Sequence, residues 1–172
     1  MIDPQTNPTG EEFEAYNIRR WGSSGWTRHL KSEGRKDGAK FEKWTWWPNT
    51  SKAHQLVLFA ERSGIDTNAS NRALFEAVYE EGMNISLVEV LVQIGSERLN
   101  LDATKLRQFL EGDEGKREVV RQIQTGRQKY RISGVPYFIV GRDGSDELPY
   151  GLSGAQTSRT FLQCFEELCE DM

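Results

Sequence analysis

Only one segment of the 172-residue sequence has the composition of a buried β-strand, and this limits the chain to a mostly helical fold. Residues 136–141 read Pro-Tyr-Phe-Ile-Val-Gly, a short run rich in aromatic and β-branched side chains. Because a turn with an Asp-Gly pair follows, residues 147–151 are expected to return as its hairpin partner. A third candidate strand spans 41–47 and ends at Pro48. Since a two-stranded hairpin is only marginally stable in water, we expect a third strand or a helix layer to support this one.

Elsewhere, apolar residues recur with helical spacing between capping residues and glycines. Capping boxes are predicted at Thr9 with Glu12, Ser86 with Glu89, and Ser153 with Gln156. Helices with both ends predicted run from Thr9 to Gly22, from Thr50 to Gly64, over 69–81 with a stop at Gly82, and through Val119 to Tyr130 with an end before Gly134. For three more helices only the start is predicted, at Ser86, at the cap Asp102 and at Ser153. Segments 1–8 and 31–39 are expected to be loose.

Composition excludes several function classes. Charged residues make up 28% of the chain and no long apolar run occurs, which argues against a membrane span. The net charge of −4 argues against a dedicated nucleic-acid binder. The polar, acidic start does not resemble a secretory signal, and two cysteines are too few for a disulfide scaffold or a four-thiolate zinc site. We therefore predict a globular cytoplasmic protein without a bound metal.

The first candidate site is Val135-Pro136. Proline has no N–H for a sheet ladder, so Pro136 must lie at the start of a strand or on an edge. An X–Pro bond can also be cis at a cost of about 0.5–1 kcal/mol. A cis bond here would turn the N–H and C=O of Val135 outward, where they could pair with an extended peptide. The alternative is an ordinary trans proline that begins the strand.

Two further candidate sites lie near predicted helix starts. Ser153, Gly154, Ala155 and Gln156 run from a strand into a helix, where free N–H groups suit an anion. The alternative for these residues is a capping box and nothing else. The second is Asn49 with His54, in which His54 would be a general base or an orienting donor. A plain surface histidine is the alternative there.

Cys164 and Cys169 are possible redox residues on the last predicted helix. Their spacing places the two Cα atoms about 8–9 Å apart in a helix. That distance exceeds the roughly 7 Å over which a disulfide forms without backbone movement. A strained and labile bridge is one interpretation, and two buried, inert thiols are the other, which we favour.

Three blocks, in this order, resemble the DsbA-like thioredoxin-fold family, in particular its FrnE-like and 2-hydroxychromene-2-carboxylate isomerase-like branch. Asn49-Thr50 with Ala53-His54 resembles the family's Asn-Thr-x-x-Ala-His helix start. Gly134 to Phe138 resembles the Gly-Val-Pro-Phe-Phe cis-proline loop, and Tyr150 with Ser153 to Gln156 resembles the Tyr-x-x-Ser-Gly-Ala-Gln turn. The resemblance implies a single thioredoxin-like α/β domain over 1–172, with a large helical insertion at about 50–131.

The family's first strand, its Cys-Pro-x-Cys motif and the following helix and strand have no counterpart in the sequence, so we expect a domain incomplete at its N-terminus. No cysteine precedes Cys164, so no catalytic residue can be assigned. We also expect the edge of the 137–140 strand to be covered by 41–47, by another chain or by an upstream segment.

The resemblance implies a thiol–disulfide oxidoreductase that acts on protein or peptide substrates, inactive as this chain because the motif is absent. In that interpretation Val135 and Pro136 align the substrate, while Ser153 to Gln156 hold an anionic end such as that of glutathione. An alternative is a non-catalytic module that binds peptides or forms a homodimer. A glutathione-dependent isomerase or transferase is a third expectation, with no other cofactor implied.

Overall fold

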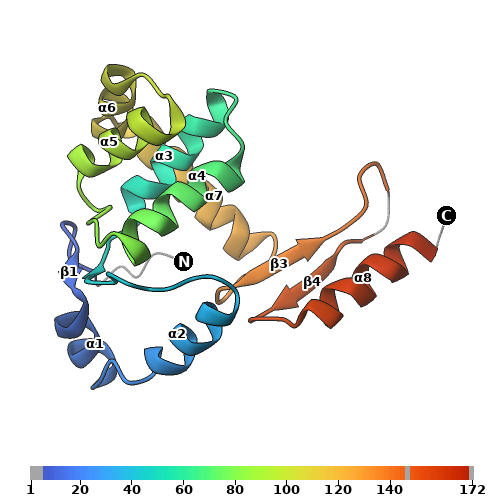
Figure 1. Ribbon diagram of the computed structural model, residues 1–172. Helices are drawn as coiled ribbons and strands as arrows, with labels where there is room; N and C mark the ends of the chain where they lie inside the picture. Colours follow the sequence, from blue (N-terminus) through green and yellow to red (C-terminus); the bar gives the residue numbers. More distant parts are fainter. Residues whose placement is uncertain (1–5, 146–147, 171–172) are drawn as a thin grey trace. The chain divides into compact units, whose positions relative to one another are not determined.

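The computed structural model describes residues 6–145 and 148–170, which form two compact units. One unit extends to Arg121 and is called the helical unit below. The other begins at Gln122 and is called the hairpin unit. Helix α7, Asp113–Gln128, begins in the first unit and ends in the second. Figure 1 shows the elements of each unit, which are described separately here.

The helical unit contains one short strand pair and a set of helices (Figure 1). The strands β1 (Glu11–Glu12) and β2 (Trp46–Trp47) are antiparallel, with Glu11 opposite Trp47. The helices before α7 are α1 (Phe13–Trp21), α2 (Thr27–Lys36), α3 (Ser51–Arg62), α4 (Thr67–Phe75), the π-helical turn η1 (Glu76–Glu80), α5 (Val88–Leu99) and α6 (Ala103–Glu111).

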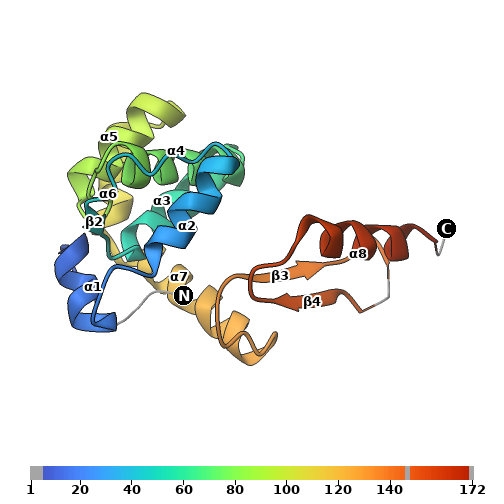
Figure 2. The ribbon, with the colours of Figure 1, turned by 60° about the horizontal axis from the view of Figure 1, so that its bottom comes forward.

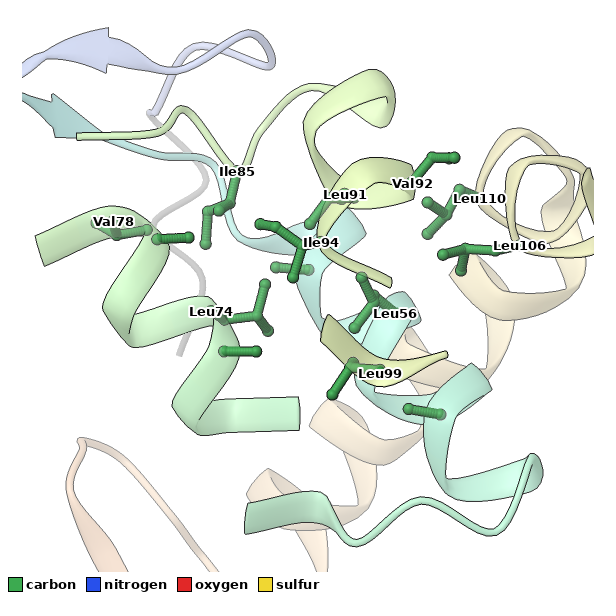
Figure 3. Close-up of a cluster of buried hydrophobic side chains, with 14 of the residues drawn as sticks. Leu56, Leu74, Val78, Ile85, Leu91, Val92, Ile94, Leu99, Leu106 and Leu110 are labelled. Atoms are coloured by element: carbon green, nitrogen blue, oxygen red, sulfur yellow. The ribbon is translucent and has the colours of Figure 1, made fainter. Parts of the chain in front are cut away.

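The core of this unit lies between α3, α4, α5 and α6, where their apolar faces meet (Figure 3). Leu56, Leu91, Ile94 and Leu106 are fully buried. Burying an aliphatic side chain of this size contributes about 1.5–3 kcal/mol, so these four residues are a main source of the unit's stability. Helices α5 and α6 approach closely because Gly95 has no side chain: a Cβ there would lie 2.3 Å from Leu106 Cδ2.

Aromatic side chains join α1 and α2 to this core. Tyr16 stacks on Trp47 with ring centroids 4.3 Å apart, and Phe13 lies 4.7 Å from Trp44. Lys31 of α2 places its ammonium group 5.0 Å from the centroid of the Phe13 ring. Helix α2 is thus connected to the aromatic cluster through Lys31.

The hairpin unit consists of the end of α7, two strands and a helix. Strands β3 (Tyr137–Val140) and β4 (Tyr150–Ser153) are antiparallel, with Tyr137 opposite Ser153. Helix α8 (Ser158–Glu170) runs along one face of this hairpin (Figure 2). Phe161 of α8 meets Phe138 edge to face, with ring centroids 4.9 Å apart. The expected helix layer is therefore present on one face.

The glycine stops and one cap are confirmed, whereas the three predicted capping boxes are wrong. Gly22, Gly64 and Gly82 follow helices with φ near +75°, and the Asp102 side chain accepts from the N–H of Lys105. Thr9 does not begin a helix, because Glu12 is the N-cap of α1 and accepts from Ala15. Likewise α5 begins at Val88 and α8 at Ser158. The hydroxyl of Ser86 instead accepts from the N–H of Asn49.

Other boundaries also differ from the prediction. The stretch 31–39 is mostly helical, within α2, rather than loose. The helix expected over 69–81 is α4 followed by η1, and α7 ends at Gln128, before Tyr130. The hairpin partner is shifted to β4. Segment 41–47 contributes only β2, which pairs with β1 and not with β3.

Candidate functional site

Val135 lies two residues before β3, and 63% of its surface is exposed. The peptide bond that joins it to Pro136 is cis. Neither its N–H nor its C=O makes a hydrogen bond with another described residue. The backbone of Val135 is therefore available to a ligand.

The hydrogen-bond pattern of the hairpin shows which groups of β3 remain open. Gly154 donates its N–H to the Pro136 carbonyl at 2.9 Å, which begins the ladder with β4. Because successive residues of a strand direct their N–H and C=O to opposite edges, Phe138 and Val140 bond to β4. Tyr137 and Ile139 direct theirs to the other edge, where no strand pairs with β3 in the described part of the chain.

We call Val135, Tyr137 and Ile139 the outer edge of β3. The side chain of Ile139 is 45% exposed, and the side chain of Tyr137 lies over Gly151. The face of the hairpin that carries these two side chains is therefore apolar. A Cβ on Gly151 would lie 2.5 Å from the Tyr137 hydroxyl, which explains the glycine at that position. Open backbone groups beside exposed apolar side chains are the features that allow an extended peptide to add as a further strand.

The four residues predicted to hold an anion lie before α8 and not at its N-terminus. Ser153 ends β4, and Gly154 has φ of +81°. The side-chain amide of Gln156 donates to the carbonyls of Ser153 and Gly154, at 2.8 and 3.3 Å. Ala155 is exposed. The first turn of α8 is instead capped by Thr157, whose hydroxyl accepts from the N–H of Thr160. The helix-terminus argument for an anion at these residues is therefore wrong.

Asn49 and His54 lie in the helical unit, whereas Val135, Pro136 and Ser153 to Gln156 lie in the hairpin unit. Asn49 is occupied structurally: its side-chain oxygen accepts from the N–H of Ser51, and its amide donates to the Thr6 carbonyl. His54 is exposed on α3, beside buried Ala53. Nearby protein atoms partly desolvate its ring and lower its pKa, which favours the neutral form.

The two cysteines are free thiols in different environments. Cys164 of α8 is buried, as predicted, whereas Cys169 is exposed, so the expectation of two buried thiols is wrong for Cys169. Four residues of helix α8 lie between them. No bridge joins them, which agrees with the distance argument.

The sequence prediction identified Val135 but missed Tyr137 and Ile139, the rest of the outer edge. The sequence alone did not show that the amides of Phe138 and Val140 bond to β4, whereas those of Tyr137 and Ile139 face the other edge. Because backbone groups alternate between the two edges of a strand, the register with β4 would have been needed to tell the bonded residues of β3 from the open ones.

The sequence profile described as the DSBA-like thioredoxin domain matches residues 36–165, about three quarters of the chain. The matched range includes all of the β3–β4 hairpin and most of α8. No curated protein matches the chain at a significant level. Among the described residues, no helix is both long and apolar enough to cross a membrane.

Proposed function

Because this chain belongs to the family of DSBA-like thioredoxin domains, we propose that it docks extended polypeptides for thiol–disulfide chemistry. We also propose that its 172 residues do not catalyse the exchange by themselves. The single observation that carries the docking function is the outer edge of β3, where Val135, Tyr137 and Ile139 present unpaired backbone groups. Strand addition at such an edge supplies main-chain hydrogen bonds whatever the sequence of the peptide.

The cysteines support the second part of the proposal. Disulfide exchange requires a thiolate that can reach a substrate disulfide, and a second thiol to resolve the mixed disulfide. The sequence holds no Cys-Pro-x-Cys motif, and the only two thiols lie on α8. Cys164 is buried there, so it cannot act as a resolving partner for Cys169 without unfolding of the helix.

Amide hydrogen exchange tests the docking function residue by residue. The probe is insulin B chain with carboxymethylated cysteines, which is extended and cannot form disulfides. We expect the Tyr137 and Ile139 amides to exchange fast in the free protein and slowly with the probe. The Phe138 and Val140 amides, bonded to β4, serve as internal controls and should be protected in both states. Outer-edge amides that are already protected in a monomer would refute an open edge.

The variant Ile139→Pro gives an independent test, because it removes one outer N–H and leaves the bonds to β4 in place. We expect it to abolish binding of the probe while the helical circular dichroism signal is retained. Retained binding would place the probe elsewhere on the chain.

An insulin-reduction assay tests the absence of catalysis. We expect the chain to give the rate of dithiothreitol alone, and the variants Cys164→Ser and Cys169→Ser to give the same rate. Acceleration that is lost in either variant would show that these thiols are redox-active and that this part of the proposal is wrong.

A second candidate function, self-association, is favoured by the same edge and by the exposed side chains of Leu162 and Phe165 on α8. An open, apolar strand edge can pair with a second copy of the chain. Light scattering coupled to size exclusion separates the two functions. A dimer that Ile139→Pro converts to monomer supports self-association, and a monomer that binds the probe supports docking.

Glutathione remains a proposed small ligand of Ser153 to Gln156, supported by the resemblance of this turn to that of the family. Since these residues precede α8 and Gln156 is bonded to the turn itself, we expect weak retention on immobilised glutathione. Strong retention that Gln156→Ala removes would instead favour an isomerase-like or transferase-like function.

A further inference from the structure

The helical unit contains an open groove of about 1350 Å³ that the proposed docking function does not use. Residues 37–42 form one wall, and helices α4 and η1 form the other. Glu80 of η1 holds the two walls in register, because its carboxylate accepts from the backbone N–H groups of Lys40, Phe41 and Glu42 at 2.9, 3.0 and 3.2 Å. The volume exceeds the roughly 300–1,000 Å³ of small-molecule pockets, which favours a larger ligand.

The groove is lined by apolar side chains that remain accessible. Phe75 is 61% exposed, and Leu30 of α2 is also exposed. Tyr79 lies beneath them, 6.0 Å from the Phe75 ring and 5.4 Å from the Phe41 ring. Exposed aromatic and aliphatic residues around one groove are typical of an interaction surface.

The charged residues of the groove are mostly acidic. Its five carboxylates outnumber its two cations; these residues are Asp37, Glu42, Glu76, Glu80 and Glu81 against Lys40 and Arg72. Some are balanced within the protein, since Glu81 pairs with Arg98 at 2.5 Å and Glu42 lies 3.7 Å from Lys40. Neither Asp37 nor Glu76 forms a salt bridge with a described residue, although the charge of Glu76 interacts with nearby Arg98.

We propose that this groove binds a cationic peptide segment of a partner protein that carries aliphatic or aromatic side chains between its basic ones. The apolar side chains would contact Phe75 and Leu30, while Lys or Arg residues would approach Asp37 and Glu76. The acidic excess of the groove makes the complementary partner basic, and it disfavours an acidic peptide. Single π-helical turns such as η1 are frequent at functional sites, which is consistent with this assignment.

Fluorescence polarisation with two labelled peptides tests the proposal. In the first, lysines alternate with leucine and phenylalanine; in the second, glutamates replace the lysines. We expect the lysine peptide to bind and its affinity to fall as salt is added, because the charges are close to solvent. Equal binding of the glutamate peptide, or binding of neither peptide, would overturn the proposal.

Matched variants then locate the site. Glu76→Lys should raise the Kd of the lysine peptide by about tenfold, roughly 1.4 kcal/mol, whereas Glu61→Lys, an equal charge change on α3 outside the groove, should leave it unchanged. Phe75→Ser should weaken binding, while Ile18→Ser, equally exposed but outside the groove, should not. If the control variants weaken binding as much as the groove variants, the groove is not the site.

The β3 edge provides the last control, since the two proposals concern different units of the chain. Because that edge can pair with any extended peptide, both peptides are also measured with Ile139→Pro, in which the lysine peptide should still bind and the glutamate peptide should not. A loss of binding in that variant would assign the peptide to the β3 edge and would refute the groove as its site.

Discussion

Glu80 illustrates how a single charged residue can fix a backbone segment that has little packing of its own. Its carboxylate accepts three N–H groups of the 40–42 segment, as a bound anion would. These hydrogen bonds, led by the one from Phe41, lower the pKa of Glu80 below its ordinary value. Segment 37–42 therefore depends on the ionised form of this residue.

Glu80→Gln should consequently destabilise the protein near neutral pH, by about 1 kcal/mol for the weakened hydrogen bonds. Because the folded-state pKa is lowered, this contribution is present above the unfolded pKa of about 4.3 and is lost as pH falls through the folded value. Urea unfolding of both proteins at pH 7 and at pH 3 checks this. The difference between them should shrink at pH 3, and the exposed control Glu61→Gln should show little effect at either pH.

The two thiols permit a second prediction at the residue scale. Cys169 should react rapidly with a thiol reagent in the native protein, whereas Cys164, 7% exposed, should react only when the hairpin unit opens. Counting reacted thiols in native buffer and in urea gives the measurement. Two fast thiols in native buffer would mean that Cys164 is not buried in the folded hairpin unit.

At the scale of elements, two glycines within helices have opposite roles. A Cβ on Gly95 of α5 would overlap Leu106 of α6, so Gly95→Ala should destabilise the protein by about 1–3 kcal/mol through overpacking. A Cβ on Gly126 of α7 would meet only Ile132 Cδ1, at an ordinary 3.6 Å. Gly126→Ala should therefore stabilise the helix by up to about 1 kcal/mol. Thermal or urea unfolding of both variants decides; equal effects would refute close packing of α5 on α6.

The sequence predicts the ends of helices better than their starts. A helix end depends on the glycine itself, whereas a capping side chain can bond to a distant part of the chain instead. Gly22 and Gly64 end helices because a positive φ is a property of the residue itself. Ser86 was expected to cap a helix, but its hydroxyl is bonded to the backbone of Asn49, thirty-seven positions away. Such a competing partner is invisible in the local pattern.

Helix α2 and the candidate site also depend on contacts between distant parts of the chain, which a local sequence pattern does not show. Segment 27–36 has one large apolar residue, Leu30, but Lys31 and Gly34 lie against aromatic rings from elsewhere in the chain, which a local pattern does not show. The motif at Val135 located the site, since proline restricts its neighbours wherever it occurs. The composition of β3 could not reveal which of its amides are open, because that depends on register with β4.

At the scale of the whole chain, buried apolar residues are distributed unequally between the two units. Among the described residues, every buried apolar side chain lies between Phe13 and Val119, except Cys164. The hairpin unit relies on one hairpin, α8 and the Phe138–Phe161 contact. A hairpin with a single covering helix is close to the minimum for stability, so a ligand or partner at the outer edge would stabilise this unit most.

Native-state hydrogen exchange should show this inequality directly. The Phe138 and Val140 amides should open with a smaller free energy than those of Leu91 and Ile94, because far less apolar surface closes over them. Phe161→Ala should lower protection in β3 and leave α5 unchanged, whereas Leu56→Ala, which removes a fully buried side chain, should cost about 2–5 kcal/mol in the helical unit. If Phe161→Ala lowered protection equally in β3 and α5, the two units would unfold as one, and stabilisation by a ligand at the β3 edge would then extend to the groove.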